Sequence, residues 1–361
     1  MAAASEFERR REAVSSRLAE RKLDALLVSF SANLRYLSGF TGSNGNLLVL
    51  PGRTILFTDP RYQFQAPQEV TCEVRVAKGP LVRDVVAVIR KLQLRRIGYE
   101  PPRMTCDWFE SLNAQLPMKA ALTPVTGWIE ELRAMKSAAE IELIRRSVET
   151  NSRAFEQAAS RVRVGLREQD FAAELEYRMR RLGAEKPAFE TIVAGGVRSA
   201  LPHAQPTAAR LESGGLVVVD MGAMCNGYCS DMTRMLFLGS PTPKVKRMYR
   251  AVQEAQQAAI DAVREGVSTA HVDREARRVL KSYGLEQAFI HSTGHGLGLE
   301  IHEPPRIGRR DKQRLKAGMA ITIEPGVYLE DFGGIRIEDT VVVTSSGCQI
   351  LTPTDKQLRV I

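Results

Sequence analysis

Two apolar runs that each carry an aspartate fill residues 216–238, which read LVVVDMGAMCNGYCSDMTRMLFL. The Asn-Gly pair near the centre is the strongest short signal for a two-residue hairpin loop. In the register that this turn sets, Asp231 lies opposite Gly222. Side chains alternate between the faces of a strand, so Asp220 shares that face and is a diagonal neighbour of Asp231. The pattern predicts two carboxylates within reach of one ion, although a solvated strand end would also carry such a pair.

A second segment repeats this arrangement about 100 residues later. Glu324 ends an apolar strand and is followed by Pro-Gly, which turns the chain. In residues 334–339, GIRIED, the isoleucines face one side while Arg336 and Glu338 face the other. A buried carboxylate without a partner is very costly. We therefore expect the two pairs of carboxylates to converge where the two halves meet.

A glycine-rich segment supplies the imidazole of the predicted centre. His295 lies in residues 291–303, HSTGHGLGLEIHE, whose glycines permit close backbone approach and argue against a zinc-binding His-x-x-x-His helix. Oxygen-rich ligation with one histidine favours manganese, with zinc, cobalt or iron as alternatives. Two ions at such a centre activate water for hydrolysis. The predicted metal ligands are Asp220, Asp231, His295, Glu324 and Glu338.

The order of expected elements indicates two domains. Residues 1–133 alternate helix and strand, beginning with a capping box at Ser5, and form an α/β domain. Residues 134–361 repeat a helix–helix–hairpin unit and form an α+β domain, a sheet of two related halves with helices on one face. The strands expected in this second domain are Leu216–Met221, Tyr228–Leu238, Met319–Glu324 and Gly334–Val343.

The composition of the 361 residues excludes several classes of protein. No apolar run approaches the roughly 20 residues of a membrane helix, and the N-terminus lacks the apolar core of a secretory signal. Five scattered cysteines are typical of free thiols in the cytoplasm. The net charge is +9, but basic residues alternate with acidic ones and are not interleaved with aromatic residues. We therefore expect a cytoplasmic protein that binds neither nucleic acid nor a membrane.

The segments that carry these residues resemble the pita-bread metallopeptidases, family M24, which includes methionine aminopeptidase, aminopeptidase P and prolidase. The matching segments run in the family's order from about Ala138 to the C-terminus. The resemblance extends to the proline-specific branch through Ala200–Thr207 and Ile301–Pro305. Tyr36–Gly45 resembles the creatinase-like N-terminal domain of aminopeptidase P, which methionine aminopeptidases typically lack.

The resemblance implies roles for residues around the ions. Glu324 is implied to be both a ligand and the proton shuttle. His203 and His302 would hydrogen-bond the substrate and the tetrahedral intermediate, and His291 would line the pocket for proline. Two further candidates for the substrate site are Arg336, which would pair with a carboxylate of a metal ligand or of the substrate, and Tyr328.

The implied function is a metallo-exopeptidase that acts on peptides with proline at the second position. We expect a Xaa-Pro aminopeptidase first, and a Xaa-Pro dipeptidase restricted to dipeptides as the alternative. A non-catalytic binding protein on the same fold is a distant alternative, because such proteins usually lose metal ligands and all five are present here. The resemblance also implies a homodimer.

Overall fold

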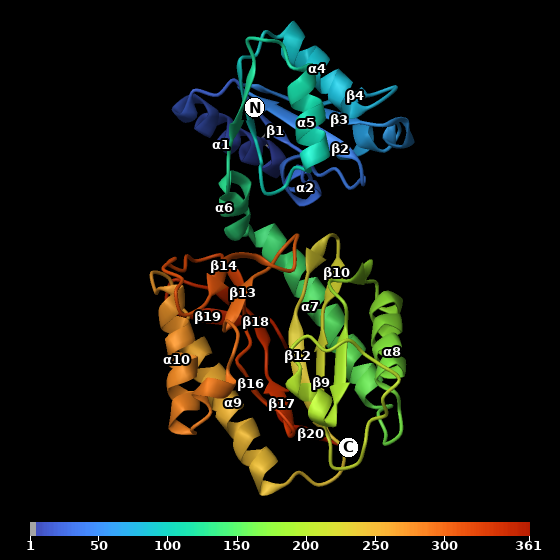
Figure 1. The fold of residues 1–361 in the computed structure, drawn as a ribbon, viewed down its shortest axis with the longest axis vertical. Helices are drawn as coiled ribbons and strands as arrows, with labels where there is room; N and C mark the ends of the chain where they lie inside the picture. Colours follow the sequence, from blue (N-terminus) through green and yellow to red (C-terminus); the bar gives the residue numbers. More distant parts are fainter. Residues whose placement is uncertain (1–4) are drawn as a thin grey trace. The chain divides into compact units, whose positions relative to one another are not determined.

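The computed structural model describes residues 5–361, and the chain divides between Arg133 and Ala134 into two compact units (Figure 1). The helices of the first unit are α1 (Glu6–Arg21), α2 (Ser31–Ser38), α3 (Ala66–Glu69), α4 (Leu81–Lys91), α5 (Cys106–Gln115) and α6 (Trp128–Ala134). Its strands are β1 (Ala25–Val28), β2 (Gly45–Leu50), β3 (Arg53–Thr58), β4 (Glu73–Val76), β5 (Arg96–Tyr99) and β6 (Ala121–Pro124).

The first unit is an α/β domain around one mixed sheet in the order β4-β3-β2-β1-β5-β6. One face of β1, with Ala25 and Leu27, packs into a core that α4 covers with an apolar stripe of Val82, Val85 and Ile89. Strand alternation turns Leu26 to the other face, on the side of α1. The predicted capping box is confirmed, since Ser5 accepts a hydrogen bond from the Glu8 amide and the Glu8 carboxylate accepts one from Ser5.

The second unit contains the repeated helix pairs and hairpins. Its helices are α7 (Ala138–Ala159), α8 (Glu168–Arg181), α9 (Pro243–Ala262) and α10 (Thr269–Ser282). The strands of the first half are β7 (Lys186–Pro187), β8 (Ile192–Gly195), β9 (Leu216–Met221), β10 (Ala223–Cys225), β11 (Tyr228–Cys229) and β12 (Met232–Phe237). Those of the second half are β13 (Gly294–Gly296), β14 (Glu303–Ile307), β15 (Ala320–Ile323), β16 (Gly326–Leu329), β17 (Gly333–Arg336), β18 (Asp339–Val343) and β19 (Cys348–Ile350). The last strand, β20 (Arg359–Val360), pairs with β12 of the first half.

The two halves form separate ladders rather than the single sheet that the sequence predicts. The larger ladders run β20-β12-β9-β8 and β14-β13-β15-β18-β19. Helices α7 and α8 contact strands of the first half, whereas α9 contacts β15, β16 and β17 and α10 contacts β14 (Figure 1). Contacts of β12 with β17 and β18 join the halves beside the residues of the predicted site.

Two predicted strands are broken, and each break contains a predicted metal ligand. The expected strand Tyr228–Leu238 stops after Cys229 and resumes at Met232, which leaves Asp231 in the break. The expected strand Gly334–Val343 is interrupted in the same way at Glu338. The pairing register is the same on both sides of each break, since Met224 pairs with Cys229 and Met221 with Met232, and Gly326 pairs with Arg336 and Ile323 with Asp339. The ladder is interrupted because the backbone there bonds to the other half: the Asp231 carbonyl accepts from the Thr340 hydroxyl, and the Glu338 amide donates to the Thr233 carbonyl. Alternation of side chains along one strand cannot reveal such bonds to a distant segment.

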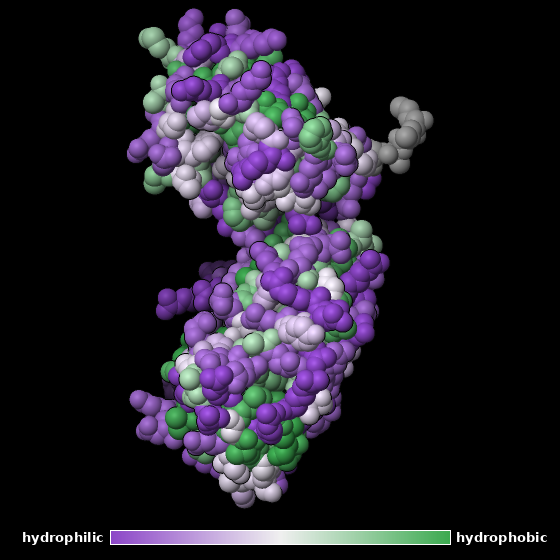
Figure 2. All heavy atoms as spheres, turned by 90° about the vertical axis from the view of Figure 1, so that its right-hand side faces the viewer, coloured by the Kyte–Doolittle hydropathy of each residue, from purple (hydrophilic) through white to green (hydrophobic). Residues whose placement is uncertain are grey.

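One face of the described residues is mainly polar. Figure 2 shows a face on which hydrophilic side chains predominate, with smaller hydrophobic groups between them. The five cysteines are free thiols, as the sequence predicts. Among residues 5–361, no helix combines the length and the apolar character needed to cross a bilayer.

Candidate metal centre

The first hairpin places its two aspartates as the sequence predicts. Cys225 pairs with Tyr228 across the turn, and the same register continues to the pair of Asp220 with Thr233. Asp231 precedes β12 and is 5% exposed, while Asp220 is the penultimate residue of β9 and is 9% exposed. The tight turn therefore brings two largely buried carboxylates to neighbouring positions.

The second half places its two glutamates beside them. Glu324 follows β15 directly, and its amide donates to the carbonyl of Thr293 at 2.7 Å. Glu338 lies in the strand break, and its amide contacts the carbonyl of Thr233 on β12 at 3.3 Å. The Thr233 hydroxyl also donates to Oε2 of Glu338 at 2.8 Å. The contacts of Glu338 cross between the halves and bring the second pair of carboxylates to the first.

The imidazole of His295 is oriented by its own strand. Gly294 and Gly296 flank it in β13, and a Cβ at either glycine would collide with the backbone of Thr322 or Pro304. Nδ1 of His295 lies 3.0 Å from the carbonyl oxygen of Gly296. A proton on Nδ1 makes that contact a hydrogen bond and leaves the lone pair of Nε2 for a ligand, the usual arrangement at metal-binding histidines.

The five predicted ligands converge. Asp231, His295 and Glu338 each offer one ligand atom, and these atoms lie within 4.8 Å of one another. Nε2 of His295 is 3.5 Å from Oδ2 of Asp231 and 3.5 Å from Oε1 of Glu324. All four of these residues and Asp220 line one cavity of about 800 Å³.

The chemistry of this donor set fits divalent cations. Among the described residues, Oδ1 of Asp220 and Oε1 of Glu338 are buried oxygens without a hydrogen-bond partner. Burial, together with the charges of Glu338 and Asp220, raises the pKa of Asp231 well above its ordinary value. Burial raises the pKa of Glu324 to about 8. Carboxylates packed this closely without sufficient positive charge are stabilised by bound metal ions.

A chain of hydrogen bonds connects the predicted substrate residues to one ligand. Arg336 donates from Nη2 to Oδ2 of Asp220 at 2.6 Å and from Nη1 to the hydroxyl of Tyr328 at 2.7 Å. The Tyr328 hydroxyl lies 2.9 Å from Nε2 of His291, whose Nδ1 lies 2.8 Å from the carbonyl of Ser292. Burial and the charge of Arg336 lower the pKa of His291 to about 3, so this imidazole is neutral near pH 7. The sequence expectation that Arg336 pairs with a metal-binding carboxylate agrees with this geometry.

The two remaining predicted histidines lie at the wall of the same cavity. His302 packs edge-on against His295 with ring centroids 4.4 Å apart, and burial lowers its pKa. His203 also lines the cavity and is exposed. Tyr328 is absent from the lining and meets the cavity only through His291 and Arg336. Nine of the ten predicted site residues therefore line one cavity.

The sequence prediction missed two residues that the structure places at the centre. Thr233 lies two positions after Asp231, so strand alternation was the available signal, and it bonds both Glu338 and Nε of Arg336. Arg306 pairs with His295 across β13 and β14 and lines the cavity. Its side chain is exposed, and in the sequence it belongs to a basic stretch, so nothing there distinguishes it from other exposed arginines.

The comparisons with known proteins agree with this architecture. The model of metallopeptidase family M24 matches residues 142–345, and that of the Creatinase/Prolidase N-terminal domain matches residues 10–135. The chain therefore belongs to metallopeptidase family M24 and is a peptidase with the two-domain fold expected from the sequence. The creatinase-like and pita-bread assignments of the two domains are confirmed.

Similar proteins cover almost the whole chain. A Xaa-Pro dipeptidase of Pyrococcus furiosus is 38% identical over 339 residues, which are 94% of this chain and 96% of that protein. The structure of a Xaa-Pro dipeptidase from Bacillus anthracis is 34% identical with a TM-score of 0.95, covering 98% of this chain and 100% of the other. An X-Pro aminopeptidase structure from Thermotoga maritima is 37% identical with a TM-score of 0.90, covering 95% and 99%.

Proposed function

We propose that this chain is a Xaa-Pro dipeptidase, which hydrolyses the bond between the two residues of a dipeptide that ends in proline. The observation that carries the proposal is Arg306. Its side chain lines the cavity of the candidate metal centre, and within residues 5–361 it forms no hydrogen bond or ion pair. The proline of such a dipeptide carries a free carboxylate next to the scissile bond. A guanidinium group binds a carboxylate through two parallel hydrogen bonds.

This proposal reverses the order of the two activities expected from the sequence motifs. Those motifs placed an aminopeptidase first, because they describe the ligands and histidines that both activities share. The names of the relatives in Pyrococcus furiosus and Bacillus anthracis support the dipeptidase instead. Arg306 supports it independently, since its guanidinium group offers a positive charge at the cavity wall to which the carboxylate of a dipeptide could bind.

We propose the following roles for the residues of the site. Asp220, Asp231, His295, Glu324 and Glu338 hold two divalent ions, with manganese as the expected metal. Such ions polarise the substrate carbonyl and lower the pKa of water. Glu324 takes the proton of the attacking water and delivers it to the proline nitrogen. His203 and His302 donate hydrogen bonds to the carbonyl oxygen as negative charge develops on it.

The neutral imidazole of His291 is proposed to border the proline ring. It is held by Tyr328 on one side and by the carbonyl of Ser292 on the other, so its orientation is fixed before substrate binds. Phe289 packs edge-on against it with ring centroids 5.0 Å apart. A fixed uncharged ring of this kind suits the apolar surface of proline.

A Xaa-Pro aminopeptidase is the second candidate, and a specific feature favours it. A further cavity of about 530 Å³ adjoins the first and shares His291, Ser292 and Arg306 with it. This cavity offers room for residues beyond proline. The name of the 37% identical structure from Thermotoga maritima supports the same activity.

Hydrolysis of matched peptides tests the proposal. With Mn²⁺ added, Ala-Pro should be cleaved with a higher kcat/KM than Ala-Pro-Ala or the amide Ala-Pro-NH2. Arg306→Met should lower kcat/KM for Ala-Pro about 30- to 100-fold, the loss expected for a hydrogen-bonded charge, and should leave cleavage of the amide nearly unchanged. Arg310→Met, at the adjoining cavity, is the control. Preferential cleavage of Ala-Pro-Ala would replace the dipeptidase by the aminopeptidase.

The assembly and location are also proposals. We propose a homodimer in the cytoplasm, and five free cysteines support a reducing compartment. Light scattering after size-exclusion chromatography measures the mass of the particle. A mass of one chain at micromolar concentration would reject the dimer.

A further inference from the structure

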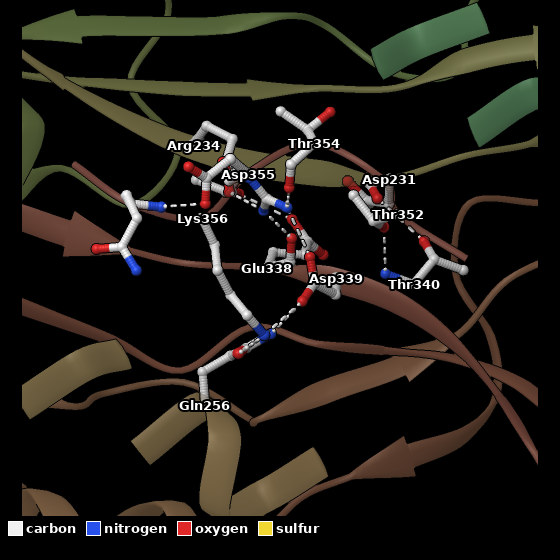
Figure 3. Close-up of polar contacts among 12 residues, drawn as sticks. Asp231, Arg234, Gln256, Glu338, Asp339, Thr340, Thr352, Thr354, Asp355 and Lys356 are labelled. Carbon is white, nitrogen blue, oxygen red and sulfur yellow. Dashed lines mark hydrogen bonds and ion pairs between the residues drawn. The ribbon is translucent and has the colours of Figure 1, made fainter. Parts of the chain in front are cut away.

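Arg234 lies behind the candidate metal centre and uses every donor that a guanidinium has. The residue is on β12, three positions after Asp231, and is 2% exposed. Its Nε donates to the carbonyl of Asp355 at 3.0 Å, and Nη1 donates to the carbonyls of Thr233 at 2.9 Å and Glu338 at 2.5 Å. Its Nη2 donates to Oδ1 of Asp339 at 2.7 Å and to the carbonyl of Thr354 at 2.7 Å (Figure 3). These five bonds equal the five N–H groups of arginine.

The acidic partner of Arg234 is held from its other side as well. Oδ2 of Asp339 accepts hydrogen bonds from Nε2 of Gln256 at 2.8 Å and from Nζ of Lys356 at 3.1 Å. Lys356 also reaches Oε1 of Gln256 at 2.9 Å, and its carbonyl accepts from the Tyr249 hydroxyl at 2.6 Å. Figure 3 shows Arg234, Gln256 and Lys356 turned toward Asp339. The network therefore ties the segment 352–356, close to the C-terminus, to β12, β18 and α9.

Hydrogen bonds in the same region also hold the main chain of two predicted ligands. The carbonyl of Glu338 accepts from Arg234, and the carbonyl of Asp231 accepts from the Thr340 hydroxyl at 3.0 Å. The amide of Thr340 in turn donates to the Thr352 hydroxyl at 2.9 Å. Asp231 and Glu338 both lie in strand breaks, where regular ladder pairing is lost. These side-chain contacts replace the ladder bonds there and leave the two carboxylates directed toward the cavity.

We propose that Arg234, Asp339, Gln256 and Lys356 form a positioning clamp that holds Asp231 and Glu338 in the arrangement that binds metal. The clamp acts on backbone carbonyls and contributes no atom to the ions. Through Lys356 and the carbonyls of Thr354 and Asp355, it makes the C-terminal segment a structural part of the metal centre. The inference rests on the metal centre of the proposed function and extends it to residues outside the cavity.

The clamp requires the particular shape of arginine. A lysine at position 234 has three donors on one nitrogen, so it cannot serve five acceptors spread over β12, β18 and the C-terminal segment. Arg234→Lys keeps the positive charge opposite Asp339 and removes the fork. The substitution therefore separates alignment of the ligands from neutralisation of the buried carboxylate.

Metal binding by variants tests the clamp without reference to peptidase activity. Chain stripped with EDTA is titrated with Mn²⁺ in a calorimeter at 25 °C, where circular dichroism confirms that each variant is folded. Co²⁺ absorption in the visible range reports the coordination geometry. Arg234→Lys should weaken at least one of the two ions about tenfold or more, the range for groups that orient metal ligands, and should alter the Co²⁺ spectrum.

A milder variant keeps the test valid if Arg234→Lys does not fold. The side chain of Lys356 is 23% exposed, so Lys356→Met should fold and weaken Mn²⁺ binding by about threefold to tenfold, while Lys356→Arg should restore it. Arg359→Met is the matched control. Arg359 lies close to Lys356 in the sequence, and its ion pair with Glu156 joins two half-exposed side chains. It should leave Mn²⁺ affinity unchanged.

The outcomes distinguish the clamp from the function on which it rests. Variants of Arg234 and Lys356 that melt earlier yet bind Mn²⁺ and Co²⁺ as the wild type does would overturn the clamp alone. A wild-type chain that bound neither ion would overturn the metal centre and the clamp together.

Discussion

Glu338 and Asp339 are adjacent in the chain, yet their carboxyl groups titrate in opposite directions. Burial and the charges of Glu324 and Asp220 raise the pKa of Glu338 well above its ordinary value. The pKa of Asp339 is lowered, because the charges of Arg234 and Lys356 more than offset an equally deep burial. The carboxylate of Glu338 lines the cavity of the metal centre, whereas that of Asp339 bonds to Arg234 and Lys356 behind it.

The difference shows how one strand separates a functional site from its support. Asp339 has its counter-charges in the protein itself, so its ion pair is complete in the folded chain. Glu338 faces three other carboxylates and has too little positive charge near it, a costly arrangement unless cations bind. A buried acid with protein cations is structural here, and a buried acid without them marks the place where metal is expected.

The largest expected effect comes from removing a ligand on the cavity side. Asp231→Ala should abolish binding of two ions and lower kcat/KM by roughly 10³-fold or more, since metal-ion stabilisation of the transition state is worth several kcal/mol. Its fold should be retained. Mn²⁺ titration and peptide hydrolysis measure the effect, with the exposed Asp261→Ala as control. Near-normal turnover would remove Asp231 from the ligand set.

Neutralising Asp339 should lower the free energy of unfolding of the metal-free chain, whereas neutralising Glu338 should raise it. Asp339→Asn leaves Arg234 buried without its main counter-charge and should cost about 3 to 5 kcal/mol. Glu338→Gln relieves repulsion among carboxylates and should stabilise the metal-free chain by about 0.5 to 2 kcal/mol. Urea unfolding in EDTA measures both free energies. Equal destabilisation by the two substitutions would show that the comparison is mistaken.

A separate effect, outside the metal centre, is a pH dependence of stability in the first unit. Glu100 is 5% exposed, and burial raises its pKa from 4.5 to about 7, with Glu130 adding repulsion. At a pH between 4.5 and about 7, Glu100 is ionised in the unfolded chain but keeps its proton in the folded chain. Stability of this unit therefore falls as pH rises from about 4.5 through 7, by up to about 3 kcal/mol.

Glu100→Gln isolates this contribution. The variant should lose that part of the pH dependence between pH 5 and 8, and the exposed Glu131→Gln should retain it. Differential scanning calorimetry at several pH values records the change in the unfolding of the first unit. An unchanged slope in Glu100→Gln would show that Glu100 is ionised in the folded chain at neutral pH.

The sequence was sufficient for the parts of the centre that depend on local periodicity. The Asn-Gly turn set the register that brings Asp220 and Asp231 together, and the alternation around Glu338 correctly separated it from the buried isoleucines. The breaks at Asp231 and Glu338 were not predictable, because the backbone at each break bonds to the other half of the domain, about 100 residues away in the chain. The role of Arg234 was not predictable, since four of its five acceptors lie more than 100 residues away in the chain.

Arg306 is a second residue whose role could not be predicted from the sequence. Its position opposite His295 depends on pairing between β13 and β14, where the register shifts at His295 and Gly296. Strand alternation within residues 303–307 gives no indication of that partner. The proposal of a dipeptidase before an aminopeptidase therefore rests on a feature of the cavity that the sequence alone does not display.

Anomalous scattering from Mn²⁺ tests the central claim most directly. A crystal of the chain soaked with Mn²⁺ and measured near the manganese absorption edge should show two strong peaks. They should lie among Asp220, Asp231, His295, Glu324 and Glu338, about 3.5 to 4 Å apart, as in other two-metal hydrolytic sites. Peaks located elsewhere, or no peak within reach of these five side chains, would contradict the account.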